Sequence, residues 1–70
     1  MDKDLILKKI AENIRVERVR KKYSQEKLAE MAGITAKYLN MIENNKANPS
    51  ISVLASLCSA LNIDIKIIFS

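Results

Sequence analysis

Apolar residues recur along most of the chain at helical spacing. In the first third, Leu7, Ile10 and Ile14 lie three and then four positions apart. This spacing puts them on one face of a helix, and charged residues occupy the other faces. The pattern predicts a first helix from about Asp4 to Lys22.

Helix-capping residues divide the next stretch into two short helices. Ser24 is a favourable N-cap and predicts a helix from about Gln25 to Met31. Gly33 follows at the position where a left-handed C-cap residue is expected. Thr35 can cap again, which predicts a further helix over Ala36 to about Glu43.

A loop rich in asparagine separates these helices from the fourth. Asn45 is the residue of this loop best suited to a left-handed conformation. Ser50 then predicts the cap of a helix that runs to about Leu61. The apolar positions of that helix are expected to face inward: Ile51, Leu54, Leu57, Cys58 and Leu61.

The last apolar segment has two interpretations. Its alternation over residues 63–67 favours a strand, whereas Asp64 as an N-cap favours a short helix over 64–69. A strand would need a pairing partner that only a second subunit supplies. We therefore predict an all-α, compact five-helix bundle, with a strand over 64–69 as the alternative.

Composition limits the chain to one small domain and removes most enzyme chemistry. The 70 residues contain no histidine, one cysteine and one glycine. These counts exclude an internal disulfide, a Ser-His or Cys-His catalytic pair and a glycine-rich phosphate loop. A binding module is expected rather than an enzyme, without a cofactor, a metal or a small-molecule ligand.

The basic charge of the chain is concentrated in one part of the sequence. Residues 1–23 carry eight Lys or Arg and four Asp or Glu, which is the whole surplus behind the net charge of +4. A basic surplus suits nucleic acid or an anionic membrane. Charge alone does not decide between a nucleic-acid partner, a membrane and an ordinary basic surface. No segment targets or spans a membrane, and the lone Cys58 fits a reducing compartment, so the cytoplasm is the expected compartment.

Residues 25–44 meet the demands of a helix-turn-helix. Ala29 is small enough for two helices to cross steeply, and Gly33 allows the positive φ that the turn needs. Leu28 and Leu39 supply apolar anchors between the helices. The second helix keeps a polar outer face, suited to the major groove of DNA.

The sequence resembles the Cro/repressor (XRE-type) helix-turn-helix family over nearly its whole length. The resemblance is carried by ENIR (12–15), SQEKLAEMAGI (24–34), YLNMIE (38–43), NPS (48–50) and LASLCSALNI (54–63). It implies a lambda-repressor-like bundle over residues 1–70 that binds operator DNA as a homodimer. It also implies a sequence-specific regulator of transcription, which often controls its own operon.

The resemblance places the DNA contacts in and around the third helix, residues 36–43. Two departures from the family, Ala36 and Met41, stand where longer polar residues are common, and they shift readout towards thymine methyl groups. Arg18 and Glu43 correspond to a structural ion pair in the family. The implied DNA-contacting residues are Gln25, Thr35, Ala36, Lys37, Tyr38, Asn40, Met41 and Lys46.

Apolar residues exceed what one small core can hide near the end of the sequence. Neither a helix nor a strand over 64–69 buries all of them, so a dimerisation segment is predicted over about 51–70. The uncharged serine face of the fourth helix lies in the same segment. The predicted dimer residues are Ser52, Ser56, Ser59, Ile65, Ile67 and Phe69.

Two biological settings compete at this stage. A bare helix-turn-helix domain of this size is similar to phage Cro-like repressors and to the controller proteins of restriction–modification operons. The alternative is an antitoxin-type interaction module whose main partner is a toxin. No additional toxin-binding segment is visible, which favours the regulator.

Overall fold

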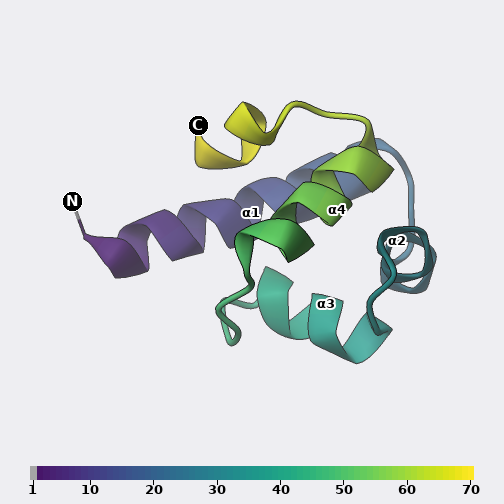
Figure 1. Ribbon diagram of the computed structural model, residues 1–70, viewed down its shortest axis with the longest axis horizontal. Coiled ribbons are helices and arrows are strands. Elements are labelled where there is room, and N and C mark those ends of the chain that lie inside the picture. The colour runs from purple at the N-terminus through teal and green to yellow at the C-terminus, as the bar shows by residue number, and fades with distance from the viewer. Residues whose placement is uncertain (1) are drawn as a thin grey trace.

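The computed structural model describes residues 2–70, and these residues form helices only. Four α-helices precede a 3-10 helix, so the all-α prediction is confirmed and the strand alternative is excluded (Figure 1). The elements are α1 (Lys3–Arg20), α2 (Gln25–Ala32), α3 (Ala36–Glu43), α4 (Ile51–Leu61) and the 3-10 helix η1 (Ile65–Phe69).

The short polar residues at the helix starts act as N-caps. The hydroxyl groups of Ser24, Thr35 and Ser50 each accept a hydrogen bond from the backbone N–H three residues later. Each cap satisfies one of the N–H groups that have no partner inside a helix. These local bonds explain why α2, α3 and α4 begin where the sequence pattern places them.

Left-handed residues end the helices and turn the chain. Gly33 has φ +75° after α2, and Asn45 has φ +57° in the loop after α3, both as predicted. Lys22 and Asn62 also have positive φ, which the sequence pattern did not indicate.

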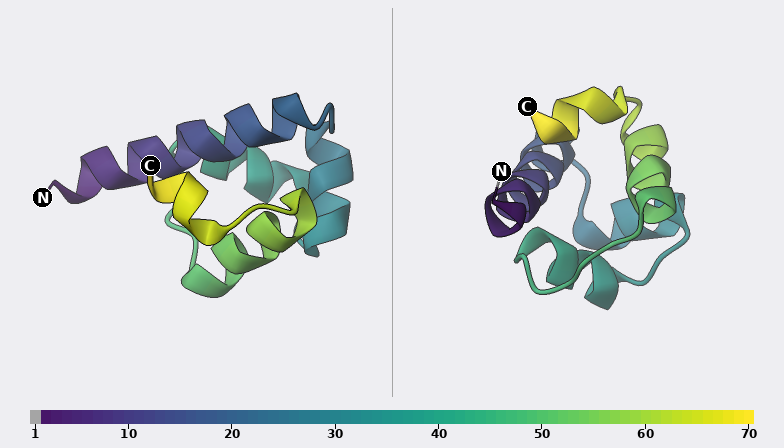
Figure 2. Two further views of the ribbon diagram at one scale, coloured as in Figure 1. Left: turned by 90° about the horizontal axis from the view of Figure 1, so that it is seen from above. Right: turned by 60° about the vertical axis from the view of Figure 1, so that its left-hand side comes forward.

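The core lies at the centre of the bundle and receives side chains from all five elements. α2 packs against α3 and α4, while η1 packs against α1 (Figure 2). The buried apolar residues include Ile10, Ile14, Leu28, Ala29, Leu39, Ile42, Leu54, Leu57, Cys58, Leu61 and Ile68.

An asparagine of α1 holds the last segment in place. The side-chain amide of Asn13 donates to the backbone oxygen of Ile68 at 3.0 Å and to that of Ser70 at 3.1 Å. Ile68 is fully buried beneath this contact. The sequence did not predict this role, because nothing in the local pattern distinguishes the half-buried Asn13 from the charged residues around it.

Ile51 and Phe69 are exposed, although Ile51 was expected to face inward. Ile51, the first residue of α4, is 64% exposed, although its spacing continues the buried stripe of that helix. Phe69 is 48% exposed because the segment is a 3-10 helix, in which residues three apart share a face. Ile65 and Ile68 therefore face the core, and Phe69 does not.

No helix within residues 2–70 combines the length and the apolar character needed to cross a membrane.

Candidate nucleic-acid interface

The α2–α3 pair forms a helix-turn-helix whose second helix is buried on one side only. Leu39 and Ile42 of α3 are buried in the core with Leu28 of α2. On the opposite side of α3, the side chains of Lys37 and Asn40 are exposed. The burial of one face therefore leaves a polar face free for a ligand.

The residues predicted to read DNA differ in how far they reach solvent. Thr35 is exposed, and its hydroxyl is already the N-cap of α3, accepting from Tyr38 N at 3.0 Å. Lys37 and Met41 are exposed. Ala36 and Tyr38 are half-buried and pack against the core, so less of their surface is available.

Glu43 is the centre of a buried polar network at the end of α3. Arg18 donates from Nε to Glu43 Oε2 at 2.7 Å and from Nη2 to Oε1 at 3.0 Å. Arg18 also donates from Nη1 to the backbone oxygen of Tyr23 at 2.8 Å. The Glu43 side chain is only 2% exposed, so this ion pair compensates a buried carboxylate.

Gln25 connects this network to the exposed face of α3. Its Nε2 donates to Glu43 Oε1 at 3.1 Å, and its Oε1 accepts from Asn40 Nδ2 at 3.3 Å. These two bonds connect the start of α2 to Asn40 within α3 and to Glu43 at its end. Sequence reasoning identified Gln25 and Asn40 separately but missed the bond between them, because it joins side chains 15 positions apart.

Lys46 lies on the loop after α3. Its side chain is exposed, while its backbone N–H donates to Met41 O at 2.8 Å. Asn45, with its left-handed φ, precedes it and directs the chain away from the helix. The loop therefore presents a cation beside the end of α3.

The residues predicted for a dimer surface are exposed, with one partial exception. Ser52, Ser56 and Ser59 lie on the exposed side of α4, and Ile67 and Phe69 are exposed on η1. Ile65 is half-buried and packs against the chain's own core instead.

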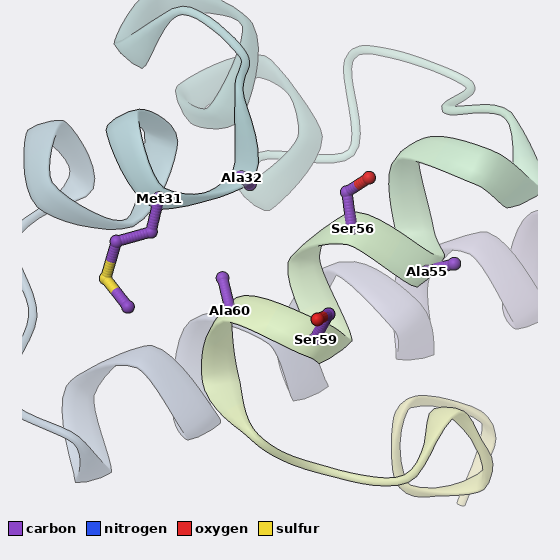
Figure 3. A pocket seen from close by; sticks show the side chains of 6 residues that line it. All are labelled: Met31, Ala32, Ala55, Ser56, Ser59 and Ala60. Atoms are coloured by element: carbon purple, nitrogen blue, oxygen red, sulfur yellow. The ribbon is translucent and has the colours of Figure 1, made fainter.

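A shallow hollow lies between the end of α2 and the serine side of α4. Small side chains form most of its lining, with Met31 at one edge (Figure 3). Ser56 and Ser59 come from α4, and Ala32 comes from α2. No charged residue lines this hollow.

Within residues 2–70, no three His, Cys, Asp or Glu side chains gather into a metal-binding group. Burial, and then the charge of Asp64, raise the pKa of the Cys58 thiol. Cys58 therefore stays protonated at neutral pH and acts as a small core residue.

Comparison with known proteins identifies relatives over most of the chain. The family profile described as "Helix-turn-helix" matches residues 14–68. The chain is 38% identical over 56 residues to control protein C.SmaI of Serratia marcescens, covering 80% of this chain and 67% of that protein. It is 39% identical over 57 residues to the transcriptional regulator SinR of Bacillus subtilis, and it spans about half (51%) of SinR.

Solved structures show the same fold. The restriction-modification controller protein C.AhdI from Aeromonas hydrophila superposes with a TM-score of 0.87 at 32% identity, over 90% of this chain and 96% of that chain. SinR in complex with DNA superposes with a TM-score of 0.82 at 35% identity, over 87% of this chain and 98% of that chain. The relatives are regulators rather than enzymes, and the chain belongs to the helix-turn-helix family of DNA-binding transcriptional regulators.

Proposed function

We propose that the chain is a sequence-specific regulator that binds double-stranded DNA as a homodimer. In this proposal α3 (residues 36–43) enters the major groove of an inverted-repeat operator. The observation that carries it is the one-sided burial of α3, which fixes the helix in the core and leaves Lys37 and Asn40 exposed. We expect the protein to act in the cytoplasm, where such an operator would lie.

Base reading is assigned to the exposed face of α3. Lys37 lies in its first turn and can donate to guanine O6 and N7 in the major groove. Met41 lies one turn further along and suits an apolar contact with a thymine methyl group. Thr35, Ala36 and Tyr38 flank this face at the start of α3.

Phosphate contacts are assigned to two residues. Gln25 stands at the start of the helix-turn-helix (residues 25–44), and Lys46 stands in the loop that follows it. Gln25 opens α2, where the positive end of the helix dipole favours an anion. Its bonds to Glu43 and Asn40 hold its side chain in a fixed orientation. Lys46 provides the second contact from the loop.

The regulatory setting proposed is that of a controller protein acting on its own operon. Similarity to C.SmaI and C.AhdI, both named as control or controller proteins, supports this setting. The similarity to C.AhdI covers nearly the whole of both chains. A regulator of this kind would be encoded beside a methyltransferase and an endonuclease.

Two alanine substitutions test the assignment of base and phosphate contacts. The operator is first selected from random duplex DNA with the purified protein. Lys37→Ala should then relax the choice of one base pair, at a cost of about 1–3 kcal/mol for a bidentate contact. Lys46→Ala should weaken binding to all sequences alike, because a phosphate contact carries no sequence information.

The affinities of the two variants for operator and for random DNA distinguish a base contact from a phosphate contact. Equal losses on operator and random DNA for both variants would reduce Lys37 to a phosphate contact. Failure of the wild-type protein to enrich any duplex sequence would overturn the proposed function itself.

A further inference from the structure

The positive charge of the chain lies mostly outside the helix-turn-helix. Residues 24–46 carry three Lys and three Asp or Glu, whereas residues 1–23 hold a surplus of four positive charges. Arg18 is occupied by Glu43. The DNA contacts proposed above include none of the other cations of α1.

A hollow between α1 and the end of α3 collects two of these cations. Its volume is about 240 Å³, and it is lined by Lys8, Ala11, Glu12 and Arg15 of α1 and by residues 43–45. The four α1 positions follow the i, i+3, i+4, i+7 spacing of one helix face. Ala11 is buried and small, so it forms the floor between the two longer cationic side chains.

The Glu43 carboxylate and two backbone N–H groups on the α3 side of the hollow are already in use. The Glu43 carboxylate accepts from Arg18 and Gln25. The backbone N–H groups of Asn44 and Asn45 donate to Asn40 O and Ile42 O. The only positive charges that line the hollow come from the α1 side chains Lys8 and Arg15.

Lys8 and Arg15 are available for that role. Neither forms an ion pair among residues 2–70, and both are exposed. Glu12 is the only carboxylate of the hollow that is not already paired, so two cations face one anion. Lys46, the next residue after the lining segment 43–45, adds a further positive charge nearby.

We propose that Lys8 and Arg15 bind a backbone phosphate of DNA in this hollow. The contact would extend the DNA-binding surface from the loop after α3 onto α1. A phosphodiester is a monoanion that an arginine fork and a lysine ammonium can hold together. The proposal rests on the proposed function, because the phosphate belongs to the duplex that α3 reads.

The test compares two double variants that remove the same charge. Lys8→Gln with Arg15→Gln removes the two cations of the hollow. Lys3→Gln with Arg20→Gln is the control, because neither Lys3 nor Arg20 lines this hollow and Arg20 pairs with Glu17. Thermal unfolding of both variants shows that each is folded before binding is measured.

Binding to operator and to random duplex is measured over a range of salt concentrations. Loss of one phosphate contact should reduce the slope of log K against log salt by about 0.9 in the hollow variant. Its ratio of operator to random affinity should stay at the wild-type value, since phosphate contacts do not read sequence. Lys8→Arg with Arg15→Lys should keep the wild-type slope.

Three results would overturn the assignment. The hollow variant could keep the wild-type slope, or the control variant could lose as much slope as the hollow variant. Loss of the operator-to-random ratio in the hollow variant would place these residues near bases instead. Absence of any DNA binding by the wild-type protein is a different result, because it would remove the proposed function as well.

Discussion

At the scale of single residues, Glu43 depends most on its hydrogen-bond partners, because its charged carboxylate is buried. A buried charge is tolerated only when partners replace the water that it loses. Arg18 supplies two hydrogen bonds and the opposite charge, and Gln25 supplies a third hydrogen bond. Among residues 2–70, no buried side-chain nitrogen or oxygen lacks a partner.

Arg18 and Glu43 should therefore be strongly coupled in stability. Removing either one leaves the other charge buried without its partner, at an expected cost of about 3–5 kcal/mol. The double variant Arg18→Met with Glu43→Leu should recover part of that loss, because no charge then remains there. Chemical unfolding of the four proteins gives the coupling energy, and strictly additive losses would contradict it.

Only some of the contacts made by single residues could be predicted from the sequence. Family resemblance pointed to Arg18 and Glu43, and the helix-turn-helix pattern indicated Leu28 and Leu39 as apolar anchors. The bond from Asn40 to Gln25 escaped prediction because no local pattern specifies contacts between side chains of different helices. The exposure of Ile51 escaped it because spacing gives the phase of a helix but not where its neighbour ends.

At the scale of elements, capping residues made the helix boundaries predictable. Ser24, Thr35 and Ser50 were expected as N-caps, and each accepts the expected backbone hydrogen bond. Such bonds are local, so they can be inferred from a few neighbouring residues. The 3-10 form of η1 could not, because the amide of Asn13, 55 positions from Ile68, helps to hold it.

Gly33 offers a test of how much the end of α2 contributes to the free energy of unfolding. Its φ of +75° is costly for a residue with a Cβ, yet an added Cβ would meet no atom within 4 Å. Gly33→Ala should therefore lower the free energy of unfolding by about 1–2 kcal/mol, through backbone strain alone.

The matched variant is Asn45→Gly, at a position with φ +57°. Here the strain of a non-glycine residue is removed, so stability should change little or rise slightly, offset by greater freedom of the unfolded chain. Urea unfolding of both variants provides the comparison. A Gly33→Ala protein as stable as the wild type would show that the turn relaxes without cost.

At the scale of the whole molecule, two surfaces differ in the polarity of their exposed side chains. The exposed face of α3 and the loop after it are polar, whereas the side formed by α4 and η1 carries serines and exposed apolar residues. Ile67 is 40% exposed and Phe69 48% exposed on the short helix η1. Exposed apolar side chains of this kind favour a protein–protein contact.

We expect a second copy of the chain to cover this surface. A homodimer about a twofold axis buries the same patch on both subunits, and uncharged serines on α4 allow close approach without unpaired charges. Such an interface would place two α3 helices on one side of the duplex. The operator should then be an inverted repeat with half-sites about 34 Å apart, one turn of DNA.

Charge placed in the interface should separate the subunits. Ile67→Asp should shift the protein to a monomer in sedimentation at micromolar concentration, because two carboxylates would be desolvated across the twofold axis. Val19→Asp is the control, since it puts the same charge at a 59% exposed apolar residue of α1, outside the predicted surface. The control should remain dimeric and bind the full inverted repeat as the wild type does. A wild-type protein that sediments as a monomer, together with an Ile67→Asp protein of unchanged operator affinity, would rule out dimerisation through η1.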